Sequence, residues 1–190
     1  MKRLLWTVAC CLTAICAQAS EPTTPYPGLE SPAHTVISCA MADASSATLL
    51  AQPNGYALEI LSVRLDGKTE RAFQDMPDIE FAGEVALATC VDKALLFVLQ
   101  GGSPYLKGEL IRKNPHSQAV EHLYFAEKSL PGWLYLNERQ MLLVFANEGH
   151  ETDKPYLVYR YVAGEGQPSE SEATDQRPVQ DGYTVMRITP

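Results

Sequence analysis

The clearest potential for molecular recognition lies in one short run, Gln100-Gly101-Gly102-Ser103-Pro104-Tyr105. Two successive glycines let the backbone adopt positive φ angles and let another chain approach closely. Ser103 offers a hydroxyl that donates and accepts hydrogen bonds, and Tyr105 adds an amphipathic aromatic ring. The run can therefore enter a cleft of a partner protein, although a plain hairpin turn would have the same composition.

The sequence carries none of the local signatures of common catalytic or cofactor sites. It has no Gly-x-Ser-x-Gly elbow, phosphate-binding glycine loop, paired-cysteine zinc spacing or His-Glu-x-x-His helix. Two acidic clusters, His150-Glu151-x-Asp153 and Asp75-x-x-Asp78-x-Glu80, are more typical of solvated turns than of metal sites. We therefore predict a protein that is not an enzyme and that holds no metal and no cofactor.

A weak internal repeat indicates how the recognition run is positioned. The apolar run 94–99 aligns with 141–146 at a shift of 47 residues, and both runs enter a polar turn followed by Pro-Tyr-Leu. A fainter copy spans 48–64 and contains Asn54-Gly55, a strong hairpin signal. Strand patterns also flank these hairpins, so each unit of about 47 residues holds about four short antiparallel strands.

Four antiparallel strands per unit predict an all-β domain of propeller-like sheets packed face to face. A closed propeller needs at least about four such sheets, and this chain has room for only about three. We therefore predict an incomplete or open propeller-like arrangement, with a β-sandwich as the alternative.

Equivalent turns of a repeat lie at the same edge of the structure. The turn after 141–146 should therefore lie beside the turn after 94–99 and extend its surface. The predicted partner-binding residues are Gly101, Gly102, Ser103, Pro104, Tyr105, Asn147, Glu148, Gly149 and His150.

The first nineteen residues have the pattern of a secretory signal peptide. Lys2 and Arg3 precede a short apolar run, and Ala17-Gln18-Ala19 supplies small residues for cleavage after Ala19. The run is shorter than a membrane-spanning helix requires, so we expect a periplasmic protein without a membrane anchor. Prolines mark 20–34 as an extended leader, 35–190 should form a single domain, and the polar composition of 164–178 predicts a mobile loop.

Cleavage of the signal would leave two cysteines, Cys39 and Cys90, both in apolar alternating segments. Because an exported chain folds in an oxidising compartment, we predict that they form one disulfide. The competing interpretation, a catalytic cysteine assisted by a histidine, lacks a recognisable local signature.

The mature chain would be strongly acidic. The net charge of the whole sequence is −8, and loss of Lys2 and Arg3 makes it −10. Such a surface repels phosphates and anionic lipid headgroups, so we expect no nucleic-acid partner and no membrane-surface partner, whereas a basic protein would be attracted. The sequence leaves the oligomeric state open.

With its signal peptide, acidic all-β domain, repeated hairpins and Gly101-Gly102-Ser103 turn, the chain resembles periplasmic immunity proteins that neutralise cell-wall amidase toxins of type VI secretion. The likeness covers most of residues 35–163. In that family a serine-bearing loop enters the cleft of a papain-like cysteine amidase and contacts its catalytic histidine. The resemblance implies that Ser103 has this role, that a secreted cysteine amidase toxin is the partner, and that binding occludes the toxin's active site.

A non-catalytic envelope binding or scaffolding module is the alternative function. It explains the export signal, the acidity and the missing catalytic signatures equally well. It does not explain the glycine-serine turn, which an inhibitor would use.

Overall fold

The structure, a computed structural model, describes residues 32–54, 58–73, 82–148 and 152–189. These residues form thirteen β-strands joined by turns and contain no helix. The prediction of an all-β domain is therefore confirmed. The same ranges hold no helix of the length and apolarity that membrane crossing requires. The predicted signal peptide, and the predicted leader up to Ser31, lie outside the described residues.

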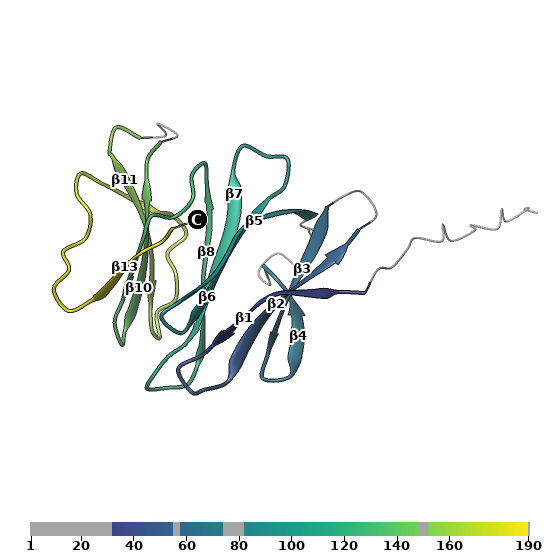
Figure 1. The fold of residues 1–190 in the computed structure, drawn as a ribbon. Helices are drawn as coiled ribbons and strands as arrows, with labels where there is room; N and C mark the ends of the chain where they lie inside the picture. Colours follow the sequence, from purple (N-terminus) through teal and green to yellow (C-terminus); the bar gives the residue numbers. More distant parts are fainter. Residues whose placement is uncertain (1–31, 55–57, 74–81, 149–151, 190) are drawn as a thin grey trace, which may run out of the picture.

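The strands follow the four-stranded unit that the sequence predicts (Figure 1). The first sheet contains β1 (His34–Ala40), β2 (Ser46–Pro53), β3 (Glu59–Leu65) and β4 (Lys68–Arg71). The second contains β5 (Ala82–Val91), β6 (Ala94–Gln100), β7 (Leu106–Lys113) and β8 (Val120–Glu127). The third contains β9 (Trp133–Leu136), β10 (Gln140–Ala146), β11 (Tyr156–Val162) and β12 (Glu172–Thr174). The last strand, β13 (Thr184–Arg187), returns to pair with β9, and all these pairings are antiparallel.

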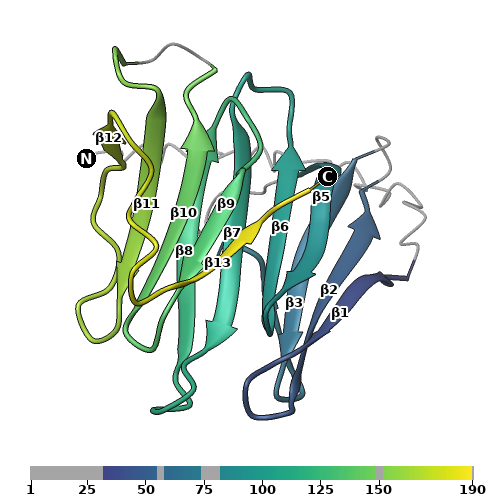
Figure 2. The ribbon, with the colours of Figure 1, turned by 60° about the vertical axis from the view of Figure 1, so that its left-hand side comes forward.

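The three sheets lie side by side as layers, with the second sheet in the middle (Figures 1 and 2). Core side chains pack on both faces of this sheet. Successive side chains of a strand point to opposite faces. Along β6, Leu95, Phe97 and Leu99 pack in the core between the first and second sheets. Leu96 and Val98 pack in the core between the second and third sheets. This double burial explains why the run 94–99 is continuously apolar.

The layers form an open arrangement rather than a closed ring. The start of β5 pairs with the start of β3 at two positions, Glu59 with Gly83 and Ile60 with Ala82. This short ladder joins the first and second sheets into one continuous eight-stranded sheet, whose two halves keep these names here. The third sheet, which includes β13, is separate and has five strands. The predicted open all-β architecture is therefore confirmed.

The predicted disulfide is present. The sulfur atoms of Cys39 in β1 and Cys90 in β5 lie 2.09 Å apart, and the two Cα atoms lie 5.4 Å apart. The bond joins the first sheet to the second. Because both sulfurs are consumed in it, neither cysteine is a thiol nucleophile in this structure.

The segment 164–178, expected to be a mobile loop, contains strand β12 and contacts two sheets. β12 pairs with β11, and Arg160 Nη2 lies 3.1 Å from Glu172 Oε2. The Gln167 side-chain amide accepts from the Tyr124 backbone N–H at 2.8 Å and donates to its carbonyl oxygen at 2.6 Å. Such polar contacts leave no apolar pattern in the sequence, so its composition does not indicate strand β12. The mobility of the segment stays a prediction.

Two neighbouring residues of β7 join the middle sheet to both outer sheets. They lie at the lower edge, which we define as the edge carrying the β1–β2, β7–β8 and β9–β10 turns (bottom of Figure 1). Lys113 Nζ lies 2.6 Å from Asp43 Oδ2 and 2.7 Å from Asp66 Oδ1, both in the first sheet's turns. Arg112 Nη1 donates to the Asn137 carbonyl oxygen, 2.7 Å away, in the β9–β10 turn. Because adjacent strand residues point to opposite faces, one strand can hold both neighbouring sheets.

The Lys113 contacts predict an acid-sensitive contribution to stability. The Lys113 ammonium, together with hydrogen bonds from Ser45, holds the pKa of Asp43 well below its ordinary value. As the pH falls below about 4, the unfolded chain takes up a proton at Asp43 before the folded chain does, so stability is lost. Asp43 and Asp66 raise the pKa of Lys113. Its contribution to the free energy of unfolding is therefore complete at neutral pH and is lost only above about pH 10.

We expect Asp43→Asn to weaken this acid dependence. Urea unfolding of the wild type and the variant at about pH 6 and about pH 2.5 measures it. The wild type should lose more free energy of unfolding between the two pH values than the variant does. Asp92 lies in the β5–β6 turn, which is also at the lower edge because β6 ends at the upper edge. It has no ion-pair partner among the described residues, so Asp92→Asn should behave like the wild type. Equal acid losses in all three proteins would contradict the prediction.

Candidate functional site

The two loops predicted to bind a partner lie at the upper edge, the edge opposite the lower edge (top of Figures 1 and 2). The first is the β6–β7 loop, residues 101–105, and the second is the β10–β11 loop, residues 147–155. Both follow a central strand that occupies the same place in its own sheet. The two loops therefore share an edge, as the repeat predicts.

The backbone distinguishes the two glycines of the first loop. Gly102 has a φ angle of +75°, and a Cβ at this position would meet no atom within 4 Å. A Cβ at Gly101 would lie 3.0 Å from the Ala82 carbonyl oxygen. A side chain at Gly101 would therefore press tightly against the start of β5. At Gly102 only the left-handed backbone favours glycine, and the residue faces open space.

Ser103 lies in an exposed stretch, since Gly101, Gly102 and Pro104 are exposed as well. Its Oγ accepts a hydrogen bond from the Tyr105 backbone N–H at 3.2 Å. This local bond orients the hydroxyl, and its proton has no acceptor within the part of the chain that the structure describes. Ser103 can therefore donate to an acceptor on another molecule.

Tyr105 and the segment after β8 connect the two loops. The Lys128 ammonium lies 5.3 Å from the centroid of the Tyr105 ring, which is a cation–π contact. The next residue, Ser129, donates through Oγ to the Ala146 carbonyl oxygen at 3.0 Å, at the end of β10. The segment 128–132 therefore lies between the two loops and fixes one relative to the other.

Asn147 organises the second loop. Its side-chain amide donates to the carbonyl oxygens of Thr152 and Lys154, at 3.0 Å and 2.7 Å. Asn147 is thus engaged within its own loop, and Glu148 beside it is exposed. The other predicted binding residues of this loop, Gly149 and His150, lie outside the described residues.

The sequence does not predict two side-chain features at the second sheet. Lys128 belongs to the upper edge, but a single lysine after a strand carries no pattern. Glu109 and His122 form a close pair, with Oε1 2.6 Å from Nδ1. This pair could have been predicted from the hairpin whose turn spans 114–119. Its register places Glu109 opposite Tyr124, and Glu109 is therefore diagonal to His122.

Comparison with known proteins adds no assignment, because no family model, curated protein or solved structure matches the chain. Among the described residues, no group of three or more His, Cys, Asp or Glu side chains could hold a metal ion. The acidic cluster at 75–80 lies wholly, and that at 150–153 partly, outside these residues. The candidate site is therefore defined by geometry: an exposed turn with a hydroxyl proton, beside an aromatic ring and fixed to a second loop.

Proposed function

We propose that the mature chain is a periplasmic immunity protein that binds a secreted cysteine amidase toxin with its upper edge. The observation that carries this proposal is the exposed turn formed by residues 101–104. Two glycines make the turn narrow, and Ser103 presents a hydroxyl proton beside them. Active sites of hydrolases lie in concave clefts, and a narrow turn of this kind fits such a cleft and excludes the substrate.

The hydroxyl of Ser103 supports a direct role in occlusion. A cysteine amidase activates its thiol with an adjacent imidazole. Ser103 already accepts a hydrogen bond from Tyr105 N–H, so its proton can be donated to that imidazole. Inhibition then needs no chemistry from this chain, because the turn fills the space that the scissile bond would occupy.

The charge of the chain supports association with a basic toxin. The sequence has a net charge of −8, which attracts a basic partner over a distance set by ionic strength. Such long-range attraction raises the association rate more than the affinity. The turn, rather than the net charge, would therefore give the complex its specificity.

The proposal is tested by using residues 20–190 as bait in a periplasmic extract and identifying the captured protein by mass spectrometry. We expect capture of a peptidoglycan amidase with a Cys/His active site. The bound amidase should lose its activity on purified peptidoglycan. Capture of envelope-assembly proteins without a hydrolase, or capture of an amidase that stays fully active, would favour a scaffolding module instead.

Gly102→Arg should weaken amidase binding by about 100-fold or more, as loss of a hot-spot contact does. The matched control is Gly164→Arg, because Gly164 has a φ angle of +83° and a Cβ there also meets no atom within 4 Å. Gly164 follows Ala163, whose N–H donates to the Arg139 carbonyl oxygen in the β9–β10 turn at the lower edge. Both variants add the same charge and a left-handed residue that costs about 1–2 kcal/mol.

Thermal unfolding should therefore shift equally in the two arginine variants, while calorimetry should show lost binding in Gly102→Arg alone. Equal affinities for the amidase would place the interface away from the β6–β7 loop.

A further inference from the structure

A separate cavity lies between the outer strands of the first two sheets. It has a volume of about 250 Å³ and is lined by β3, β4, β7 and β8. Its apolar wall includes Val63, Ile111 and Val120. Since a water molecule takes up about 30 Å³ in the liquid, the cavity has room for about eight non-hydrogen atoms. It does not involve the upper edge.

The polar wall of this cavity is built around a buried carboxylate. The Glu109 side chain is 2 % exposed, and its Oε1 lies 2.6 Å from His122 Nδ1. Its Oε2 accepts a hydrogen bond from the Phe73 backbone N–H at 3.3 Å. Because both carboxylate oxygens are occupied, Glu109 serves to orient the imidazole.

The orientation of His122 leaves one ring nitrogen for a ligand. The ring lies parallel to Tyr124, with 9° between the planes and 6.0 Å between centroids. With Nδ1 held by Glu109, Nε2 is the remaining polar atom, and it has no partner among the described residues. The side chain is 27 % exposed and lines the cavity.

The charges around the cavity favour an anion. Lys68 and Arg71 line it from β4, and neither side chain has an ion-pair or hydrogen-bond partner in the ranges that the structure describes. Three acids also line it. Asp66 pairs with Lys113 at 2.7 Å, Glu109 pairs with His122, and Glu70 has an interaction of its own. The cations therefore remain uncompensated at the mouth of an apolar pocket.

We infer that this cavity binds a small organic carboxylate with a short apolar tail. The carboxylate would contact Arg71 and Lys68, and it would accept a hydrogen bond from His122 Nε2 when the imidazole carries a proton on each nitrogen. The tail would lie against Val63 and Ile111. The inference is independent of the proposed immunity function, because the cavity and the upper edge share no residue. Failure of one proposal would leave the other standing.

The test titrates residues 20–190 with hexanoate, hexan-1-ol and hexylammonium, three probes with the same tail and different head groups. Chemical shifts of the His122 ring and of the Ile111 amide report binding by nuclear magnetic resonance. We expect saturable binding of hexanoate, and binding of both other probes at least about tenfold weaker, as loss of a charged hydrogen bond produces. Equal binding of the alcohol, or no saturation by hexanoate at tens of millimolar, would overturn the inference.

Variants of two exposed arginines distinguish binding in the cavity from a general effect of the net charge on hexanoate binding. Arg71→Gln should weaken hexanoate binding by about tenfold. Arg64→Gln removes the same charge from β3 at a residue that does not line the cavity, so it should leave binding unchanged. Both residues are exposed, so thermal unfolding should show that both variants fold. Equal loss of hexanoate binding in the two variants would also overturn the inference.

Discussion

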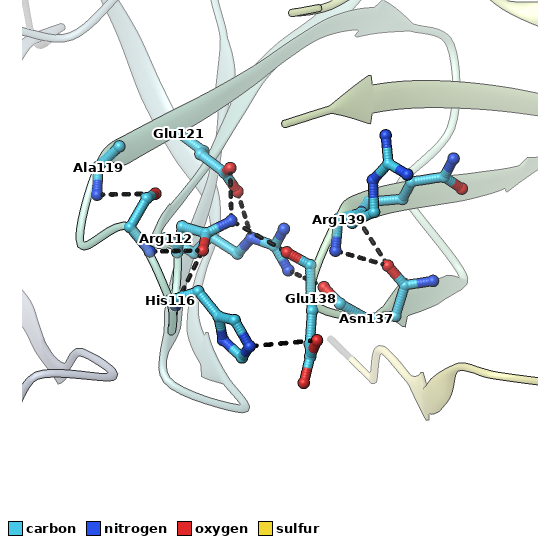
Figure 3. Close-up of polar contacts among 10 residues, drawn as sticks. Arg112, His116, Ala119, Glu121, Asn137, Glu138 and Arg139 are labelled. Carbon is cyan, nitrogen blue, oxygen red and sulfur yellow. Dashed lines mark hydrogen bonds and ion pairs between the residues drawn. The ribbon is translucent and has the colours of Figure 1, made fainter. Parts of the chain in front are cut away.

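Replacing Arg112 with leucine should lower the free energy of unfolding by about 3–5 kcal/mol, the usual effect of leaving a buried charge unpaired. Arg112 Nε lies 2.7 Å from Glu121 Oε2, and the two side chains are 6 % and 3 % exposed. Figure 3 shows this pair beside the β9–β10 turn that Arg112 also binds. The variant would keep the Glu121 carboxylate buried with one neutral hydrogen bond, from Asn114 Nδ2 at 2.9 Å.

Urea unfolding at neutral pH measures this effect. Arg139→Leu is the control, because it removes an exposed arginine from the same edge and should change stability by less than about 0.5 kcal/mol. The double variant Arg112→Leu/Glu121→Leu should recover part of the loss, since it removes both buried charges together. Arg112 Nη2 is buried without a hydrogen-bond partner among the described residues, which adds to the desolvation that the double variant relieves. A loss below about 1 kcal/mol in Arg112→Leu would show that this pair behaves like a solvated one.

The strand order can be predicted from the sequence because short apolar runs are separated by strong turn residues. The runs 94–99 and 141–146 become β6 and β10, which are buried on both faces. Their continuous apolar composition is the direct consequence of that burial. The disulfide can be predicted as well, because only two cysteines follow the predicted signal peptide.

The contacts on the face of the third sheet that points away from the second sheet could not be predicted in this way. The Arg177 guanidinium lies 4.5 Å from the centroid of the Trp133 ring, and Tyr183 packs edge-on against Tyr135 at 6.0 Å. Through these contacts the C-terminal segment covers this face of the third sheet (Figure 2). In a closed propeller, another sheet would pack there. Isolated pairs of this kind have no periodicity, so only the folded structure brings them together.

At the candidate site too, the sequence predicts the turn but not the contacts of the side chains. Composition predicts an exposed turn at 101–104, because glycine, serine and proline favour turns. It does not predict that Asn147 is engaged by Thr152 and Lys154 within its own loop. A short side-chain amide serves a turn or a partner equally well, so spacing alone does not distinguish the two roles.

Removing the disulfide should have an effect as large as the Arg112 substitution. Cys39 and Cys90 are 51 residues apart in the sequence, and the chain-entropy relation gives about 4 kcal/mol for a loop of that length. Cys39 is 1 % exposed and packs in the core between the first two sheets. Among the described residues, strand pairing between these sheets is limited to the two-residue ladder of β3 and β5, so the covalent bond is a major constraint on the first sheet.

We therefore expect Cys39→Ala/Cys90→Ala to lower the free energy of unfolding by about 4 kcal/mol in urea. Amide hydrogen exchange should accelerate more in β1–β3 than in β10 and β11, because the bond restrains only the first two sheets. A reductant is the matched control, since Cys90 is exposed: it should destabilise the wild type and leave the alanine variant unchanged. Free, alkylatable thiols in protein isolated without a reductant would contradict the bond. An unchanged stability of the variant would mean instead that the apolar core and the Lys113 contacts hold the first sheet without it.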